Sequence, residues 1–361
     1  MLISILRSDN LNYNEDKIKY YLNNILSIPS PSGFTEKIMD YIKKELGILN
    51  VPYIVTNKGA VIATLKGENN DYQRTLTAHV DTLGAMVKKI NPSGSLSLDP
   101  IGGYMMNSIE GENCTIETID CNSIKGKSFT GTIQSIKPSV HISGDDAREL
   151  KRIPENMEII LDEKISTKKE VEDLGLSVGD FICFDARTIF TEKGFVKSRH
   201  LDDKASVAIL LYTIKYILES GIKLPYTTNI FISNYEEVGH GASASIPEKT
   251  KEFVSVDMGC PGLDQNSSEY SVCICAKDSS GPYDLELRKR LTQICKKEKI
   301  DYKIDVYPHY GSDASAALRA GWDIKAALIG AGIFASHGYE RTHMDSILNT
   351  LNLIIKYCFQ K

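Results

Sequence analysis

The chain has 361 residues, more than one hydrophobic core usually holds, so two domains are the expected organisation. Its apolar fraction of 42% and charged fraction of 25% are typical of a soluble globular protein. A net charge of −5, with no block of lysine and arginine, argues against nucleic acid as a partner.

Membrane and secretory signals are also missing from the sequence. No stretch approaches the ~20 apolar residues that a membrane span needs. The start, MLISILRSDN, has neither a basic region nor a long apolar run, so it does not predict a signal peptide. The eight cysteines include no C-x-x-C pair and are interpreted as reduced, mostly buried thiols, with Cys273 and Cys275 in a core strand. These features predict a cytoplasmic protein with no membrane partner.

The first 80 residues predict two packing helices followed by strands. Apolar residues recur at helical spacing in residues 18–28 and 35–46. Residues 53–65 and 74–80 are rich in β-branched side chains and predict strands, with a turn at 67–71 between them.

The second of these strands ends in His79-Val80-Asp81. Residues i and i+2 of an extended chain share a face, so His79 and Asp81 point the same way. The carboxyl end of a strand is where open α/β sheets place their ligand sites. Taken alone, the pair is better explained by a strand-end histidine hydrogen-bonded to a nearby aspartate, with no further role.

The sequence pattern changes between residues 88 and 195, where short runs typical of β-strands alternate with turn residues. This pattern is typical of a small β-barrel or sandwich and predicts an inserted domain. One helix is predicted at residues 167–174, capped by Ser166 and ended by Gly175. His141 and the pair Asp145 and Asp146 are interpreted as surface features. The predicted strands are 95–98, 114–118, 131–135, 158–161 and 181–184.

The pattern of alternating helices and strands resumes with a predicted apolar helix over residues 204–219. Asp202 and Asp203 immediately precede this helix. Either aspartate is a sufficient helix cap, and a cap alone would explain the pair. Residues 229–234 predict a buried strand that runs into Glu236 and Glu237. A solvated acidic turn is the ordinary explanation for such a pair, because burying both charges without a cation would be costly.

The remaining chain repeats this arrangement. A short strand at 252–256 ends in Asp257, and Asp313 stands where it would cap the next helix. A strand at 325–329 precedes a loop with two histidines, His337 and His343. The other predicted elements are helices at 285–296, 314–320 and 346–359 and a strand at 302–306.

These segments together supply what a centre with two divalent ions needs. Such a centre requires a bridging carboxylate, a nitrogen and a carboxylate ligand to complete each ion, and a spare carboxylate as base. If each of the five segments had only a structural role, five unrelated coincidences would be needed to give the same set of residues. The sequence therefore predicts a hydrolase with two metal ions.

The ordered motifs resemble those of the dinuclear metallo-aminopeptidases of the tetrahedral-particle type, peptidase family 42. This family also holds glutamyl and deblocking aminopeptidases and proteins labelled cellulase M. The resemblance covers nearly the whole chain. It rests on Ala78–Asp81, Leu201–Asp203, Glu236–Gly239, Val256-Asp257, Gly311–Ala314 and Tyr339–His343, with a Gly-Asp turn at 175–180.

The resemblance implies a role for each motif residue. Asp202 would bridge both ions, His79 and Asp257 would complete one metal site, and Glu237 and His343 the other. Glu236 would be the general base. Asp81 would orient His79. The implied fold is an α/β three-layer sandwich with a mixed central sheet, residues 1–87 and 196–361, and an inserted β-barrel dimerisation domain at 88–195.

Several positions depart from the family pattern. Met344, Asp345 and Ser346 follow His343 in place of the usual Ser-Pro, so His337 remains an alternative final ligand. Thr82 stands where a glutamate is common, Lys204 replaces an arginine, and His240 is a local change beside the base. These differences predict a divergent branch with its own substrate.

The leading hypothesis is a metal-dependent aminopeptidase acting on small peptides. Zinc, cobalt and manganese all suit a mixed nitrogen and oxygen site, with zinc favoured. A related amidohydrolase or deacylase is the alternative enzyme, and a catalytically silent oligomeric scaffold is the alternative from another class. Glycoside hydrolysis is disfavoured, because it normally uses two carboxyl groups and no metal. The resemblance also implies a homo-oligomer built from dimers, up to a dodecamer.

Overall fold

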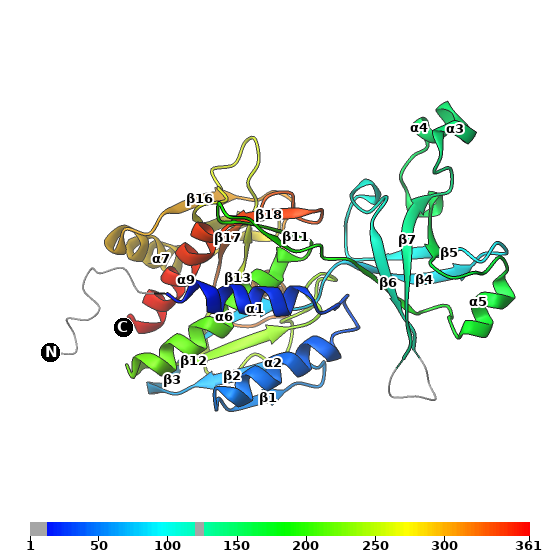
Figure 1. Cartoon of the computed structure of the whole chain (residues 1–361). Coiled ribbons are helices and arrows are strands. Elements are labelled where there is room, and N and C mark those ends of the chain that lie inside the picture. Colours follow the sequence, from blue (N-terminus) through cyan, green and yellow to red (C-terminus); the bar gives the residue numbers. More distant parts are fainter. Residues whose placement is uncertain (1–12, 120–125) are drawn as a thin grey trace.

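The computed structural model describes residues 13–119 and 126–361 and contains two units (Figure 1). An α/β unit carries both ends of the described chain, and a smaller β-rich unit lies beside it. The first ten residues, MLISILRSDN, and Cys121 lie outside the described residues. The seven described cysteines are all free thiols.

A nine-stranded mixed sheet forms the centre of the α/β unit, in the order β1-β2-β12-β3-β13-β17-β14-β15, with β16 paired to β14. Its middle strands, β12, β3, β13 and β17, are mutually parallel, so their carboxyl ends lie at one edge. The strands are β1 (Tyr53–Val55), β2 (Val61–Leu65), β3 (Gly67–His79), β12 (Leu224–Ser233), β13 (Thr250–Gly259), β14 (Val272–Asp278), β15 (Gly281–Pro282), β16 (Tyr302–Val306) and β17 (Lys325–Gly332).

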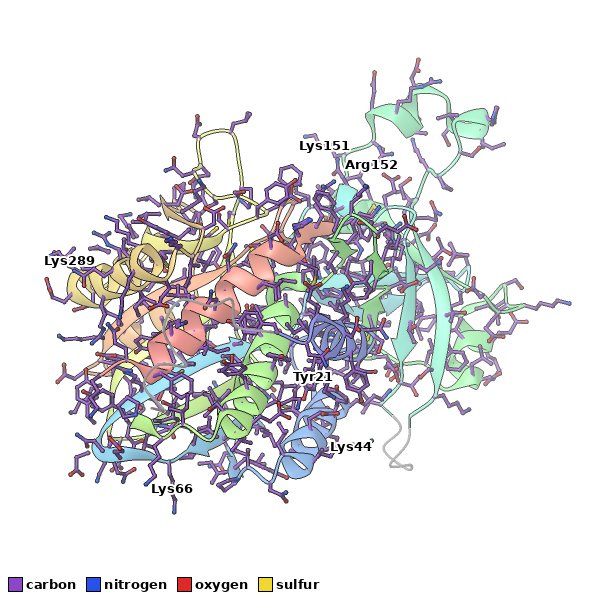
Figure 2. The ribbon with its side chains drawn as sticks, turned by 60° about the vertical axis from the view of Figure 1, so that its left-hand side comes forward. Tyr21, Lys44, Lys66, Lys151, Arg152 and Lys289 are labelled. Carbon is purple, nitrogen blue, oxygen red and sulfur yellow. The ribbon has the colours of Figure 1, made fainter. Side chains whose placement is uncertain are left out.

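Alternate side chains of these strands enter two different cores. Ile230 and Ile232 join the larger core with five helices, while Phe231 between them joins a smaller core with α8. Tyr21 of α1 is buried in the larger core, whereas Lys66 and Lys289 point outward (Figure 2). The helices are α1 (Glu15–Leu26), α2 (Glu36–Ile48), α6 (Leu201–Ser220), α7 (Leu285–Glu298), α8 (Asp313–Arg319) and α9 (Met344–Phe359).

The inserted unit is a closed barrel of six strands in the order β4-β5-β8-β7-β6-β9, with its own apolar core. The predicted α/β fold with an inserted small barrel is therefore confirmed. The barrel begins at Gly84, ahead of the expected start at residue 88. Its strands are β4 (Gly84–Ile90), β5 (Leu96–Ile101), β6 (Asn113–Glu117), β7 (Ser128–Ser135), β8 (Met157–Leu161) and β9 (Phe181–Phe184).

Short helices decorate the barrel. Thr167, not Ser166, caps α5 (Lys168–Leu174), because Thr167 and Glu170 satisfy each other's backbone N–H groups in a capping box. Gly175 ends α5 in the left-handed conformation, as predicted. Figure 1 shows α3 (Val140–Ser143) and α4 (Asp145–Glu149) projecting from the barrel. In the described part of the chain, no helix is long and apolar enough to cross a membrane.

Two differences from the predicted elements come from strand pairing. The predicted turn at 67–71 is instead the first part of β3, because Gly67 and Asn69 pair with Leu224 and Tyr226 of β12. A small antiparallel sheet also brings distant segments together. It contains β10 (Ile189–Phe190), β11 (Phe195–Ser198) and β18 (Glu340–His343).

Arg74 forms the centre of a buried polar network in the α/β unit. The Arg74 Nε lies 3.1 Å from a Glu252 carboxylate oxygen, and Nη1 donates to the carbonyl oxygens of Tyr357 and Gln360, each at 2.8 Å. Arg74 and Glu252 are both 1% exposed. The network joins strands β3 and β13 to the end of α9.

We expect Arg74→Met to lower the free energy of unfolding by about 1.5–3 kcal/mol, because it removes charge-assisted hydrogen bonds and leaves the buried Glu252 carboxylate paired with Arg290. Chemical denaturation of both proteins measures the difference. A loss below about 1 kcal/mol would show that the network adds little to stability.

Candidate metal centre

The site forms where the parallel strands end. β3 ends at His79, β12 leads into Glu236 and Glu237, and β13 carries Asp257 near its end. β17 leads into the loop that carries His337. Because these strands run in the same direction, the residues at their carboxyl ends lie together at one edge of the sheet.

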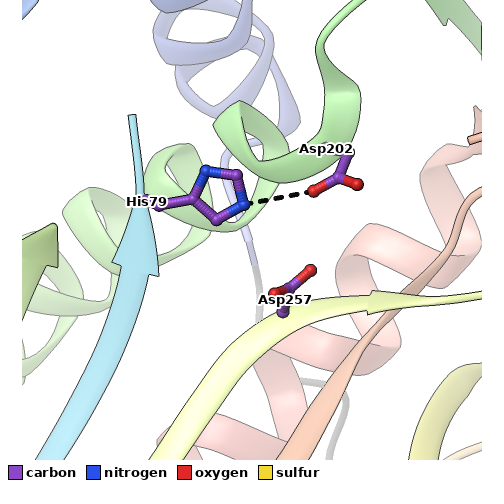
Figure 3. Close-up of side chains that lie close together, drawn as sticks. All are labelled: His79, Asp202 and Asp257. Atoms are coloured by element: carbon purple, nitrogen blue, oxygen red, sulfur yellow. Dashed lines mark ion pairs between the residues drawn. The ribbon is translucent and has the colours of Figure 1, made fainter. Parts of the chain in front are cut away.

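The first potential ligand group comprises His79, Asp202 and Asp257, each offering an atom within 4.8 Å of the others (Figure 3). The His79 Nε2 lies 3.2 Å from Asp202 Oδ1. Asp202 stands at the start of α6, where it and Asp203 have non-helical backbone angles. All three side chains are buried.

The second group comprises Asp202, Glu237 and His337, again within 4.8 Å of one another. The His337 Nε2 lies 3.5 Å from Asp202 Oδ2 and 3.6 Å from Glu237 Oε2. Asp202 thus directs one oxygen toward each group. The geometry is that of a carboxylate placed between two neighbouring sites.

The electrostatics of the site favour cations. Burial and the neighbouring Asp202 raise the pKa of Asp257 to about 7, and burial raises the pKa of Glu236 and Glu237 well above the usual value. For Asp202, burial opposes ionisation, but hydrogen bonds from His337 and His79 outweigh it and lower the pKa. Among residues 13–119 and 126–361, only histidines form ion pairs with these carboxylates.

Asp81 has a different contact with His79 from the one expected. The His79 Nδ1 lies 2.9 Å from the backbone oxygen of Asp81 and 3.5 Å from its carboxylate. A carbonyl oxygen only accepts, so Nδ1 donates there, and Nε2 is the ring nitrogen that faces Asp202. The Asp81 carboxylate instead accepts from the backbone N–H groups of Glu236 and Glu237, at 3.1 and 3.2 Å.

Two more charged side chains hold the loop that carries Glu236. The buried Asp313 carboxylate accepts from the Ala242 N–H at 2.8 Å, and the Lys58 ammonium donates to the carbonyl oxygens of His240 and Gly241. Asp313 was predicted to cap α8, but Ser312 occupies the cap position. The Asp313 side chain turns into the core and supports the loop.

His343, predicted as the final ligand, lies outside both ligand groups. It ends β18, and its Nε2 donates to the carbonyl oxygen of Lys193 at 2.8 Å. Its Nδ1 accepts from the Asp345 N–H at 3.1 Å, as the cap of α9. Both ring nitrogens are therefore occupied, and His337 takes the predicted place of His343 beside Asp202 and Glu237.

Sequence reasoning missed two supporting residues. The Tyr310 hydroxyl donates to Asp257 Oδ1 at 2.6 Å. The buried Glu340 accepts from the backbone N–H groups of Asp202 and His337, each at 3.1 Å. Burial, reinforced by the charge of Asp202, raises the pKa of Glu340 to about 8. Tyr310 lies outside the motifs, and Glu340 lies within Tyr339–His343 but was assigned no role, so only the folded structure reveals their contacts.

Both groups open into a pocket of about 410 Å³, whose wall also includes Tyr310, Arg319 and Met258. This volume lies within the ~300–1,000 Å³ usual for small-molecule sites. A larger pocket of about 570 Å³ lies between the barrel and the end of α1. It contains no member of either ligand group, so the smaller pocket is the candidate active site.

A comparison with known families identifies the chain. The model of the M42 glutamyl aminopeptidases matches residues 59–353, which include every residue of both ligand groups. The chain belongs to the M42 peptidase family. The predicted family and metal-dependent aminopeptidase activity are thereby confirmed.

Other M42 proteins resemble the chain over most of its length. YhfE of Bacillus subtilis (strain 168), named as an aminopeptidase, is 52% identical over 336 residues, 93% of this chain and 95% of YhfE. Glutamyl aminopeptidase of Lactococcus lactis is 25% identical over 246 residues, 67% of this chain and 65% of that protein.

The fold is shared with solved structures. The TET1 peptidase of Pyrococcus horikoshii matches with a TM-score of 0.82 and 23% identity, covering 95% of this chain and all of that one. The P. horikoshii protein can assemble into a tetrahedron or a large octahedral shell. At this identity the likeness establishes the fold alone.

Proposed function

We propose that the protein is a dinuclear metallo-aminopeptidase in which Asp202 bridges two divalent ions. His79 and Asp257 would complete one site, and Glu237 and His337 the other. The observation that carries this proposal is the shared position of Asp202 between two groups of nitrogen and oxygen donors, each within 4.8 Å. Zinc is the proposed metal, because mixed imidazole and carboxylate sites suit it; cobalt and manganese are compatible.

The residues fit such ions chemically. Two divalent cations would balance the four buried or half-buried carboxylates of Asp202, Glu236, Glu237 and Asp257. The Nε2 atoms of His79 and His337 both face the carboxylates. Each would give up its proton to bind a cation. When bound, the ions would acidify a water molecule and polarise the scissile carbonyl group.

We assign the proton transfers of the reaction to the Glu236 carboxylate. Its carboxylate belongs to neither ligand group but lies 3.6 Å from His79 Nε2, at the wall of the pocket. From there Glu236 would accept a proton from the attacking water and deliver it to the departing amine nitrogen. Asp81 would hold the backbone of Glu236 and Glu237 in place, since its carboxylate accepts from both N–H groups.

Small peptides are the proposed substrates. The pocket volume of about 410 Å³ suits a short segment of chain, not a folded protein. We also propose a cytoplasmic location and a homo-oligomer built from dimers. The assembly of the P. horikoshii TET1 peptidase into closed shells supports the oligomer and makes a dodecamer the form to look for.

An assay series tests the proposed reaction. Purified protein is stripped of metal with a chelator, reconstituted with zinc, cobalt or manganese, and assayed on peptides with different free N-terminal residues. We expect removal of metal to abolish release of N-terminal residues and reconstitution to restore it. Activity that survives full metal removal would contradict the proposal.

A second set of substrates separates the alternative enzyme. Matched peptides with acetylated N-termini should not be cut, because the proposed reaction acts beside a free amine. Cleavage of the acetylated set alone would favour the deacylase hypothesis. Binding of both ions with no hydrolysis of either set would favour a silent scaffold.

A further inference from the structure

A loop of the inserted barrel reaches the metal centre. The loop joins β5 to β6, and the Gly103 carbonyl oxygen lies 2.5 Å from the Nδ1 of His337. The carbonyl oxygen only accepts, so His337 donates from Nδ1 and presents Nε2 to Asp202 and Glu237. A residue of the barrel thereby selects the tautomer of a proposed ligand.

The neighbouring Gly102 approaches Glu237, another residue of the second group. Its φ is +76°, and a Cβ atom there would lie 2.5 Å from Leu83 Cδ2 and 3.5 Å from the carbonyl oxygen of Glu237. Glycine avoids both the strain and the contact. By contrast, a Cβ on Gly103 would meet no atom within 4 Å.

Arg199 ties this loop to the segment that carries His337. It follows β11, is 3% exposed, and donates to the carbonyl oxygens of Ser108 in the loop and of Gly338 beside His337. Its guanidinium also lies 3.2 Å from the Glu112 carboxylate, at the far end of the loop. One buried side chain therefore connects the barrel loop with the histidine segment.

The two ligand groups differ in their dependence on the barrel. In the described chain, the hydrogen-bond partners of His79 and Asp257 belong to the α/β unit, among them Asp81, Tyr310 and Met258. In the second group, His337 donates to the barrel loop, and a Cβ atom on Gly102 of that loop would come within 3.7 Å of the Glu237 side chain. A disturbance of the barrel loop should therefore affect one group and spare the other.

We propose that the barrel is a structural part of the metal centre, with Arg199 as a positioning residue. Arg199 and loop 102–112 hold His337, and so set the affinity of the Asp202–Glu237–His337 group for its ion. The inference rests on the proposed two-ion function. Its physical basis is that groups hydrogen-bonded to a metal-binding histidine typically change metal affinity about 10–100-fold when removed.

Zinc binding by two matched pairs of variants tests this inference. Arg199→Lys keeps the charge but loses the fork that reaches two carbonyl groups at once. Its control, Arg74→Lys, alters a buried arginine in the network of Glu252, away from the site. Gly102→Val forces the loop to move, while its control Gly47→Val enters open space on α2, away from the site. Each folded variant is titrated with zinc against a competing chelator.

We expect wild type and both controls to bind two zinc ions per chain. Arg199→Lys and Gly102→Val should retain one ion at wild-type affinity and bind the second about 10–100-fold more weakly. If wild type binds two ions and both Arg199→Lys and Gly102→Val bind zinc as wild type does, this inference is wrong. The proposed two-ion function would still stand. Wild type with fewer than two ions would instead contradict the proposed function, and the inference with it.

Discussion

Glu236→Gln is expected to reduce kcat by about 10²–10⁴-fold while the protein keeps both metal ions. The substitution preserves size and removes the group proposed to carry protons. Glu236 lies outside both ligand groups, so the metal content should not change. Steady-state kinetics on a free N-terminal peptide, with metal analysis of the same sample, measures both effects.

The matched control for this prediction is Glu248→Gln, an exposed glutamate on the same segment after β12. It should behave as wild type in both measurements. A Glu236→Gln protein with full activity would remove Glu236 from the mechanism. Loss of a metal ion together with activity would instead assign Glu236 as a ligand.

His337→Ala is expected to lose one metal ion per chain and nearly all activity, because it removes the only nitrogen donor of the second group. His343→Ala should keep both ions. The imidazole of His343 bonds to Lys193 and Asp345, so its loss should affect mainly the stability of the β18–α9 corner. Metal analysis and thermal unfolding of the two variants distinguish these outcomes.

The opposite pattern would restore the assignment that the sequence motifs favour. If His343→Ala lost an ion and His337→Ala retained both, the second site would have to lie elsewhere. Equal loss in both variants would indicate that the loop between the two histidines acts as a unit. The comparison is sharp because the two residues lie on one connection, six positions apart.

Most of the fold and much of the site could be predicted from local sequence. Periodic apolar runs indicated the helices and the parallel strands, and polar residues just after those strands indicated the site edge. His79, Asp202, Glu237 and Asp257 meet because parallel strands end on the same side of a sheet. Five of the six barrel strands followed from their turn residues, whereas β4 (Gly84–Ile90) was not predicted.

The choice between His337 and His343 could not be made in this way. It depends on β18, a four-residue strand that exists through its pairing with β11, some 140 positions earlier in the chain. The same limitation applies to Asp313 and Asp81. A carboxylate at a helix start or strand end looks like a cap or an orienting group, and only the folded loop reveals that both bind backbone N–H groups around Glu236.

Anomalous diffraction from crystals grown with zinc tests the central claim most directly. The proposal predicts two peaks in each chain, on either side of the Asp202 carboxylate. One should be held by His79 and Asp257, and the other by Glu237 and His337. A single peak in fully loaded crystals, or a second peak beside His343, would contradict it.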